Sequence, residues 1–361
     1  MKILVVFATA GAGHKKAAEA LYEGLCARAG HEAFLVDVLE HTNGFYRSLY
    51  SRLYTLLISR LPWLWGFFFR VSDIPVLQPL IRVLRRLHNG VHAGRFQQYL
   101  IREQFDYVFS THFFPNEVAA YLKRRGRISS CIVCAVTDFD VHRIWLADGI
   151  DRYTVASDWT KRKMSALGVP EERVTVTGIP VARKFSQPKD IPALRARCGL
   201  SEDLLTVLLA TGSFGIGPIE EIIAQLAGIQ VLVVCGHNRS LFQRLSGQKK
   251  ELVKVFGLVD NMDELMAAAD VMITKPGGLS ISEALVCGLP LIFFSAIPGQ
   301  ESHNVQVLAE YGVGLSGCSI SEMAAALKHF GDDREAYQAA REQTRTLARP
   351  QAVQDITQLI P

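Results

Sequence analysis

Short, unbroken hydrophobic runs recur along the chain, and stretches with helical spacing of apolar residues follow them. The clearest runs are Lys2–Ala8 and Leu204–Ala210, and a glycine-rich loop follows each of them. Strands that are buried on both faces of a parallel sheet have this continuous apolar pattern, without alternation. The chain therefore predicts an α/β protein built from two successive halves, each opening with a strand, a glycine loop and a helix.

The segment Asp270–Asn304 has the most informative pattern. It predicts a strand, a tight turn at Gly277 and Gly278, and a helix that Ser280 or Ser282 can cap. Backbone N–H groups at the beginning of such a helix point outward at the positive end of the helix dipole, which suits a phosphate group. The turn is therefore a candidate phosphate site, although most strand–turn–helix units in α/β proteins bind no ligand there.

Side chains around this turn could complete a nucleotide-sugar site. Lys275 places a mobile cation beside the turn, and Glu283 offers a carboxylate for a ribose diol. Beyond the next predicted strand, Gln300, Glu301 and Asn304 carry amide and carboxylate groups that suit sugar hydroxyls. A phosphate site, a diol site and further hydroxyl ligands along one segment together indicate a nucleotide-sugar.

The loop after the first predicted strand contains Gly11, Gly13 and His14. The βαβ arrangement allows a dinucleotide site with Asp37 as the ribose ligand, but Lys16 stands where the third glycine of that motif would be. His14 is either a reactive imidazole on the loop or a cap for the following helix. The residues alone leave both interpretations open.

The segment Asn43–Phe69 departs from the α/β pattern. Apolar residues recur at three- and four-residue steps, arginines are interleaved, and a Trp/Phe cluster follows. From Asn43 to Arg102 the chain has nine Arg, no Lys and one acid, a local net charge of +8, and the remainder carries −4. Arginines beside aromatic rings suit an anionic bilayer surface, and a buried core helix is the alternative. The candidate membrane and acceptor residues here are Tyr46, Arg47, Arg52, Arg60, Trp63, Trp65, Phe67 and Phe68.

A further pair of candidates follows the predicted strand Ile128–Thr137. Asp138 and His142 lie just beyond the carboxyl end of this strand, where ligands collect in open α/β sheets. They are candidates for binding the acceptor or assisting a base. Asp138 can equally well cap a turn.

The sequence TKPGGLSISEALVCGLP, followed by PGQESHN, resembles the donor-binding signature of the monogalactosyldiacylglycerol synthases and processive diacylglycerol glucosyltransferases of glycosyltransferase family 28. That group is related to the peptidoglycan lipid II glycosyltransferase. The resemblance covers nearly the whole chain and is strongest in residues 270–304, good in 131–181 and poorest in 43–102. It implies the GT-B fold, in which two Rossmann-like domains face each other across an interdomain cleft.

The resemblance implies a role for several loops. His14 matches the residue thought to be the catalytic base, and Asp138 is the second catalytic candidate. The glycine loop after Leu204–Ala210 is placed like the loop that faces the donor diphosphate. The backbone near Val259 is placed like the part that recognises the nucleotide base of the donor. The donor-binding candidates are Gly13, Gly212, Ser213, Phe214, Val259, Lys275, Gly277, Gly278, Leu279, Ser280, Glu283, Gln300, Glu301 and Asn304.

The same resemblance predicts the domain organisation. Residues 1–185 are expected to form the acceptor- and membrane-binding domain, and residues 186–339 the UDP-sugar-binding domain. A final helix, at about 340–361, is expected to pack back on the first domain, as is usual in this architecture.

Composition limits the partners and the compartment that can be expected for this protein. The chain is 49% hydrophobic, and its net charge of +4 is too modest to indicate a nucleic-acid partner. The seven Cys are scattered, which favours a reducing compartment, and Cys131 and Cys134 are predicted to be core residues rather than zinc ligands. No signal peptide is expected, and the longest apolar run, Leu61–Phe69, is shorter than the roughly 20 residues of a membrane-spanning helix. A peripheral protein on the cytoplasmic face of a membrane is the expectation.

The predicted reaction is transfer of a hexose from a UDP-sugar to the hydroxyl of diacylglycerol or a similar lipid, with inversion at the anomeric carbon. No metal or other cofactor is expected, because the only acid pair with the DxD spacing of a metal-binding motif, Asp138 and Asp140, falls in the acceptor half. Two alternatives remain: transfer of N-acetylglucosamine to a polyprenyl-linked acceptor, and a non-catalytic nucleotide-binding membrane protein.

Overall fold

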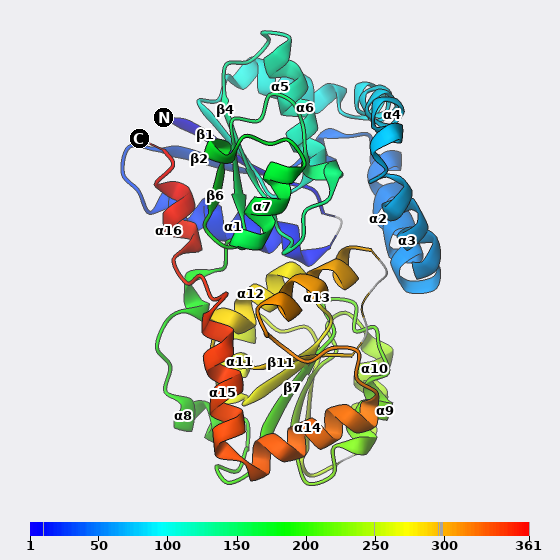
Figure 1. Cartoon of the computed structure of the whole chain (residues 1–361), viewed down its shortest axis with the longest axis vertical. Helices are drawn as coiled ribbons and strands as arrows, with labels where there is room; N and C mark the ends of the chain where they lie inside the picture. Colours follow the sequence, from blue (N-terminus) through cyan, green and yellow to red (C-terminus); the bar gives the residue numbers. More distant parts are fainter. Residues whose placement is uncertain (10, 249, 295, 297–298, 361) are drawn as a thin grey trace. The chain divides into compact units, whose positions relative to one another are not determined.

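The structure, a computed structural model, describes residues 1–9, 11–248, 250–294, 296 and 299–360, and within this range the side chains at 45, 48, 51, 52, 54, 55, 58 and 59 lie outside the description. By their internal contacts the residues form two compact units (Figure 1). Unit 1 consists of Met1–Ala182, Ile297–His303 and Gln351–Pro361, and unit 2 of Arg183–Ala296 and Asn304–Pro350.

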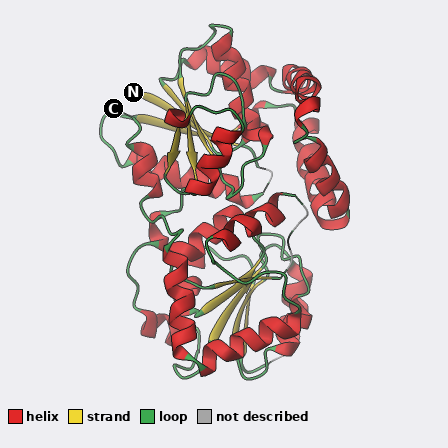
Figure 2. Cartoon of the chain, in the orientation of Figure 1, coloured by secondary structure: helices red, strands yellow, loops and turns green. Residues whose placement is uncertain are grey.

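Unit 1 is built on a six-stranded sheet in the order β2-β1-β3-β4-β5-β6, and every neighbouring pair is parallel. Helices lie on both of its faces (Figure 2). The strands are β1 (Lys2–Phe7), β2 (Glu32–Asp37), β3 (Tyr107–Ser110), β4 (Cys131–Ala135), β5 (Arg152–Val155) and β6 (Val174–Val176). The helices are α1 (Ala12–Cys26), α2 (Gly44–Arg60), α3 (Pro62–Val71), α4 (Gln78–His92), α5 (Gly94–Glu103), α6 (Phe113–Arg124), α7 (Asp158–Ala166) and α16 (Ala352–Thr357), with 3-10 turns η1 (Val38–His41), η2 (Pro75–Leu77), η3 (Arg143–Trp145) and η4 (Glu171–Arg173).

Strand β1 explains the continuous apolar run at the start of the sequence. Leu4 and Val6 belong to the core on one face of the sheet, whereas Ile3 and Val5 belong to the core on the other. Both sets are fully buried. Because successive side chains of a strand point to opposite faces, a strand covered on both sides needs apolar residues at every position.

Unit 2 is built on a five-stranded parallel sheet in the order β11-β10-β7-β8-β9. Its strands are β7 (Thr206–Ala210), β8 (Gln230–Val234), β9 (Val253–Phe256), β10 (Val271–Thr274) and β11 (Leu291–Phe293). Its helices are η5 (Arg183–Phe185), α8 (Ile191–Arg197), α9 (Ile219–Gln225), α10 (Arg239–Gly247), α11 (Met262–Ala268), α12 (Gly278–Val286), α14 (Ile320–Asp332) and α15 (Arg334–Arg345). Helix α13 (Gln300–Glu310) has its first residues in unit 1 and the rest in unit 2.

The last helix of the chain packs on the first. Ile356 and Ile360 are buried in the same core as Leu21 and Leu25 of α1. The Arg28 guanidinium donates a hydrogen bond to the carbonyl of Thr357. Residues 351–360 therefore complete the core of unit 1, although residues 340–350 belong to unit 2.

The beginning of α12 differs from the sequence-based prediction. Helix α12 begins at Gly278, and its N-cap residue is Gly277, so the prediction that Ser280 or Ser282 caps this helix is wrong. Both serines lie inside the helix, and the Ser282 hydroxyl donates to the carbonyl of Gly278 at 3.0 Å. Gly277 has extended backbone torsions, with φ −77° and ψ 131°, so the helix begins at the next residue without a side-chain cap.

The contact between α1 and α16 depends on Gly24. A Cβ added there would lie 2.3 Å from Cγ1 of Val353, a stiff β-branched side chain. We expect Gly24→Ala to lower the free energy of unfolding by about 1–3 kcal/mol, although alanine is the better helix former. Gly90 in α4 is the matched control, because nothing lies within 4 Å of its added Cβ. Gly90→Ala should raise stability by up to about 1 kcal/mol in urea denaturation; equal effects of the two substitutions would contradict the packing argument.

Candidate active site

His14 lies in the first turn of α1, directly after Gly13. It makes no capping hydrogen bond for this helix, whose N-cap residue is Gly11, so the capping interpretation is wrong. Nδ1 of His14 is 2.7 Å from the carbonyl oxygen of Thr111 and 2.9 Å from the hydroxyl of Thr137. A carbonyl oxygen can only accept a hydrogen bond, so Nδ1 carries the proton and Nε2 keeps its lone pair. Within the part of the chain that the structure describes, Nε2 makes no hydrogen bond.

Burial keeps the His14 ring neutral. Loss of water around the ring lowers the pKa of His14 to about 4, and the bond to the Thr111 carbonyl opposes this shift without cancelling it. His112 lies edge-on to His14, with 4.7 Å between ring centroids. Burial holds the pKa of His112 well below its usual value, and repulsion from a protonated His14 ring would lower that pKa further. Its Nδ1 accepts from the Phe114 N–H and caps α6, so His112 has a structural role.

The segment Thr137–Arg143, which follows β4, is a hub of contacts in unit 1. Thr137 bonds to His14, as described above, and the Asp138 carboxylate accepts a hydrogen bond of 2.6 Å from Nε2 of Gln300. Asp140 lies 2.6 Å from the ammonium of Lys163 and 2.9 Å from Nδ1 of His303. One short segment thus contacts the His14 loop and residues 299–303.

His142, at the end of this segment, holds α3. Its Nδ1 accepts from the Ile144 N–H, and its Nε2 donates to the carbonyl of Phe69 at 2.9 Å. Burial lowers the pKa of His142, while the nearby Asp73 carboxylate opposes that shift. Both ring nitrogens are therefore engaged by the backbone, and this residue is 5% exposed.

In unit 2 the candidate donor residues lie on loops at the carboxyl ends of adjacent strands. Thr274 of β10 pairs with Ala210 of β7, so the loops that begin at Lys275 and Thr211 start side by side. No side chain caps the helix after Gly277. Among the described residues the N–H groups of Gly278, Leu279 and Ser280 have no acceptor, as expected for the first turn of an uncapped helix. This turn is shaped to receive an anion.

The glycine loop after β7 is locked against the loop after β8. Gly215 and Gly236 both have positive φ, of 56° and 57°, and a Cβ on either would lie within 2.4 Å of a carbonyl oxygen of the other loop. Ser213 accepts a hydrogen bond of 2.8 Å from the His237 N–H. The loop carrying Gly212, Ser213 and Phe214 is therefore held in a fixed shape next to the turn after β10.

The remaining donor candidates lie around this edge of the sheet. Asn304 is buried, and its Nδ2 donates to the carbonyl of Pro276 at 3.0 Å, so it supports the turn before Gly277. Lys275, Glu283 and Val259 are half-buried, and Val259 follows β9. Gln300 and Glu301 belong to unit 1 by their contacts.

Asp37, the ribose ligand of the dinucleotide alternative, has other partners. One oxygen accepts from the Thr9 hydroxyl at 2.6 Å, and the other accepts from the Leu39 N–H at 3.0 Å. These bonds fix the end of β2 and cap η1. They argue against a ribose at this position.

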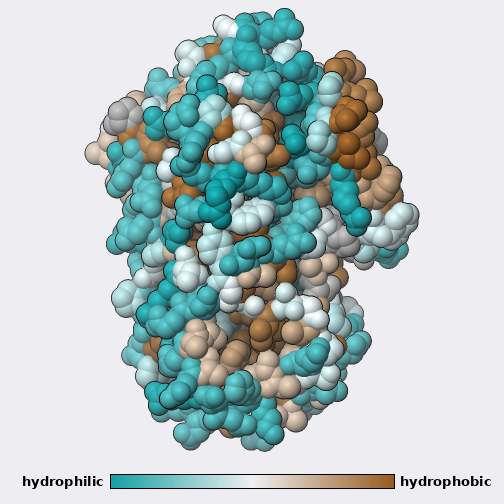
Figure 3. Space-filling view, in the orientation of Figure 1, coloured by the Kyte–Doolittle hydropathy of each residue, from teal (hydrophilic) through white to brown (hydrophobic). Residues whose placement is uncertain are grey.

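Helices α2–α4 expose large hydrophobic side chains to solvent, and Figure 3 shows this surface most clearly over α4. We call this surface, together with the turn between α3 and α4, the apolar face. Trp63, Phe67 and Phe68 are 66%, 57% and 54% exposed. Its other members are Leu49, Leu53, Leu56, Ile74, Val76, Leu80, Val83, Leu84, Leu87 and Val91, each at least 42% exposed.

Helix α4 is inverted relative to an ordinary surface helix. Its exposed stripe, at 80, 83, 84, 87 and 91, is apolar and has helical spacing. Its inner side is polar: Gln78 and Asn89 are buried, and Arg85 lies 2.8 Å from the Glu117 carboxylate of α6. This apolar stripe was not among the predicted membrane residues, although its helical spacing is present in the sequence.

The candidate membrane residues divide into surface and interior positions. Arg47 and Arg60 are exposed, and Trp65 is half-buried. Tyr46 is 7% exposed, because its ring stacks on His92 at 4.1 Å and its hydroxyl contacts His88. The side chain of Arg52 lies outside the described residues. Tyr46 is thus an interior residue, and its predicted membrane contact is not supported by the structure.

Comparisons with known proteins identify the family. The family model for monogalactosyldiacylglycerol (MGDG) synthase matches residues 14–181, and that for the glycosyltransferase family 28 C-terminal domain matches residues 216–356. A processive diacylglycerol beta-glucosyltransferase of Bacillus cytotoxicus is 30% identical over 375 residues, which cover 99% of this chain and 93% of that protein. The chain belongs to glycosyltransferase family 28, in the group of the MGDG synthases and processive diacylglycerol glucosyltransferases.

Other relatives agree with this family 28 assignment. A processive diacylglycerol beta-glucosyltransferase of Bacillus cereus is 29% identical over 372 residues, covering 99% of this chain and 93% of the relative. The crystal structure of Acinetobacter baumannii MurG has a TM-score of 0.65 at 15% identity, with 99% of each chain covered. Anabaena HepE in complex with UDP has a TM-score of 0.60 at 16% identity, covering 100% and 99%. The predicted GT-B fold, with two Rossmann-like parallel-sheet domains, is confirmed.

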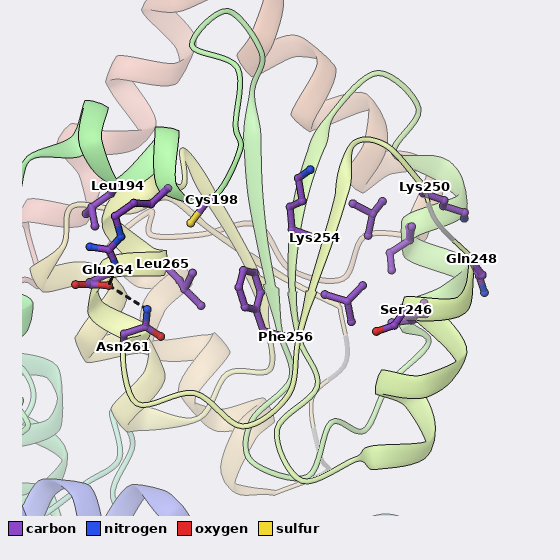
Figure 4. A pocket seen from close by; sticks show the side chains of 15 residues that line it. Leu194, Cys198, Ser246, Gln248, Lys250, Lys254, Phe256, Asn261, Glu264 and Leu265 are labelled. Carbon is purple, nitrogen blue, oxygen red and sulfur yellow. Dashed lines mark hydrogen bonds and ion pairs between the residues drawn. The ribbon is translucent and has the colours of Figure 1, made fainter.

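Unit 2 of this family 28 protein also has a pocket of about 490 Å³ beside the edge strand β9 (Figure 4). Lys254 and Phe256 of that strand line it, and Asn261 donates to Glu264 at its rim. None of the donor candidates lines it. The pocket therefore lies apart from the glycine turns.

The state of His14 can be measured directly. We expect its ring to stay neutral, with the proton on Nδ1, from pH 8 down to about pH 5, because burial lowers its pKa to about 4. Long-range ¹⁵N–¹H correlation spectra report both charge and tautomer, and His14→Gln identifies the signals. A titration midpoint near 6.5, or a proton on Nε2, would contradict the assignment. The pKa of His14 is lower in the folded protein than in the unfolded chain. Stability should therefore fall as the pH drops from about 6.5 toward 4, because in this range the unfolded chain binds a proton that the folded protein does not bind.

Proposed function

We propose that this family 28 protein transfers a hexose from a UDP-hexose to the hydroxyl of diacylglycerol, with inversion at the anomeric carbon. The observation that carries the proposal is the His14 ring, neutral and fixed in the tautomer that leaves Nε2 unprotonated. The relatives that match 99% of the chain are named diacylglycerol glucosyltransferases, which supports the acceptor and makes glucose the first donor to test.

The acceptor hydroxyl is a poor nucleophile until a base removes its proton. In the proposed mechanism Nε2 of His14 accepts that proton as the oxygen attacks the anomeric carbon, and the bond to the UDP oxygen breaks. The Thr111 carbonyl holds the ring at Nδ1 and stabilises the imidazolium that forms. A pKa of about 4 belongs to the ring without substrate, and an anionic diphosphate nearby raises it. Direct attack produces the inversion.

The leaving UDP needs stabilisation of its negative charge. The uncapped N-terminus of α12, the loop at Gly212–Phe214 and the Lys275 side chain are proposed to receive the diphosphate. Glu283 is proposed to bind the ribose diol, and Val259 to contact the nucleotide base. Gln300 and Glu301 are proposed to bind the sugar hydroxyls. These groups supply the charge stabilisation without a metal ion, and no cofactor is proposed.

The apolar face is proposed to dock on an anionic membrane, where the lipid acceptor resides. Exposed tryptophan and phenylalanine side chains suit the headgroup region, and the neighbouring arginines suit lipid phosphate. The inversion of α4 supports this role, because an apolar stripe facing water lowers solubility unless a partner covers it. No helix among the described residues is long and apolar enough to cross a bilayer. The scattered cysteines, which favour a reducing compartment, support the cytoplasmic face as the side on which we propose that the protein docks.

A polyprenyl-linked acceptor is the second candidate function. It draws on the shared fold with MurG, at 15% identity, and therefore carries less weight than the diacylglycerol relatives. A purely nucleotide-binding protein is the third, and the oriented His14 argues against it.

Product analysis decides among these functions. Purified protein is incubated with diacylglycerol vesicles, or with a polyprenyl-linked acceptor, and a panel of UDP-sugars in EDTA. Mass spectrometry should find hexosyl-diacylglycerol, and the anomeric configuration should be opposite to that of the donor. Transfer only to the polyprenyl acceptor, UDP binding without transfer, or activity abolished by EDTA would each overturn a named part of the proposal.

His14→Ala should abolish most turnover and leave UDP binding unchanged. Removing a general base typically costs about 10²–10⁴ in rate, and His14 contributes no group to the proposed diphosphate site. The product assay measures turnover, and calorimetry measures UDP binding. Near-wild-type turnover would exclude His14 as the base.

Paired substitutions test the membrane contact. Phe67→Ser with Phe68→Ser should reduce binding to anionic vesicles by more than tenfold, because two exposed rings are lost from the apolar face. Ile191→Ser is the control, since Ile191 is also exposed, at 47%, but lies in unit 2. Vesicle co-sedimentation at low and high salt provides the measurement. Loss of self-association in place of vesicle binding would instead identify a protein–protein surface.

A further inference from the structure

We propose that Phe69, Asp138 and Asp140 are positioning residues that hold the segment Gly299–His303, and so determine how tightly the sugar of the donor is bound. The inference rests on the proposed function, since it assigns the sugar hydroxyls to Gln300 and Glu301. It gives Asp138 a role through Gln300, rather than a direct one at the reacting atoms.

The ring of Phe69 and the backbone of Gly299 are packed together. A Cβ at position 299 would lie 2.9 Å from Cδ1 and 3.0 Å from Cγ of Phe69, and Gly299 has φ +100°. Only glycine fits both the conformation and the space. The Ser302 hydroxyl closes this turn, accepting from the Gly299 N–H at 3.0 Å. The start of α13 therefore lies directly on an aromatic ring of α3.

Two carboxylates hold the same turn from another side. Asp138 accepts from Nε2 of Gln300 at 2.6 Å, and Asp140 contacts Nδ1 of His303 at 2.9 Å. Both carboxylates are buried, at 5% and 7% exposure. Burial would raise the pKa of Asp140, but hydrogen bonds from His303 and Lys163 outweigh it and lower that pKa. Residues 300 and 303 are thus anchored by charged groups shielded from water, where such bonds are strong.

The anchors leave part of Gln300 available for a ligand. Among the described residues its side chain makes one hydrogen bond, which uses Nε2, and no described residue forms a hydrogen bond with the amide oxygen or the second N–H. An amide held by one N–H keeps a donor and an acceptor in fixed directions, which suits a pair of adjacent sugar hydroxyls. Fixing this side chain beforehand removes the entropy cost of ordering it when the sugar binds.

Phe69 also belongs to the helix that carries Phe67 and Phe68 of the apolar face. His142 fixes the carbonyl of Phe69, and Asp73, just after this helix, accepts from the Arg143 N–H at 3.1 Å. Residues 137–143 thereby connect α3 to the Gln300 turn. A shift of α3 upon contact with lipid would move the ring on which Gly299 rests.

The test compares affinities for UDP and UDP-glucose by calorimetry without lipid. The ratio of the two dissociation constants isolates the contribution of the sugar to binding. We expect Phe69→Ala and Asp138→Ala to weaken UDP-glucose binding about tenfold and UDP binding less than twofold, as loss of one to two sugar hydrogen bonds would. Asp138→Asn keeps an oxygen that can accept from Gln300 and should restore most of the ratio.

A matched control and a double mutant separate positioning from general damage. Phe34→Ala removes another half-buried ring of unit 1, which packs on Phe105 at 5.6 Å, and should leave the ratio unchanged. If Phe69 acts through Gln300, Phe69→Ala with Gln300→Ala should weaken UDP-glucose no more than Gln300→Ala alone. Equal losses for UDP and UDP-glucose, additive effects, or an unchanged ratio in Phe69→Ala would overturn the inference. Wild-type protein that binds no UDP would overturn the proposed function as well.

Discussion

A carbonyl oxygen can accept a hydrogen bond but cannot donate one, and the chemistry proposed for this protein depends on that constraint at Thr111. The carbonyl lies just past β3 and faces Nδ1 of His14 at 2.7 Å. It determines the tautomer, and the tautomer determines which nitrogen is free to act. Thr137, just past β4, approaches the same nitrogen from the neighbouring strand. The parallel sheet thus orients one imidazole from two adjacent strand ends.

The apolar face exposes to solvent the kind of side chain that the rest of unit 1 buries. In most of unit 1 apolar side chains are buried on both sides of the sheet, whereas α4 exposes its apolar stripe and buries Gln78, Asn89 and the Arg85–Glu117 pair. Polar groups hydrogen-bonded on the inside replace part of the packing that such a helix normally provides. This arrangement is stable in water only to the extent that the polar contacts are satisfied, and it leaves the hydrophobic surface exposed for the proposed contact with lipid.

Local patterns predicted the strands well, because a strand covered on both faces is apolar along its buried length, as β1 is after Lys2 and β7 after Thr206. They predicted the beginnings of helices less well. Helix α6 begins at Phe113 because the ring of His112 accepts from the Phe114 N–H, and α12 begins after a glycine that needs no cap. The apolar stripe of α4 has helical spacing, but such spacing does not show which side of a helix faces outward. The turn at Gly277 was found from its residues, and the role of His14 from the family resemblance. The contacts of Thr111 and Phe69 are distant in sequence and were found only in the structure.

The position of α16 makes the completion of unit 1 depend on the last residues of the sequence. Ile356 and Ile360 lie in the same core as Leu21 and Leu25, so the face of the first sheet that carries α1 is closed by residues that leave the ribosome after all of unit 2. The core of unit 1 is therefore complete only after all of unit 2 has been synthesised, so the N-terminal half alone does not supply the whole of its own interior.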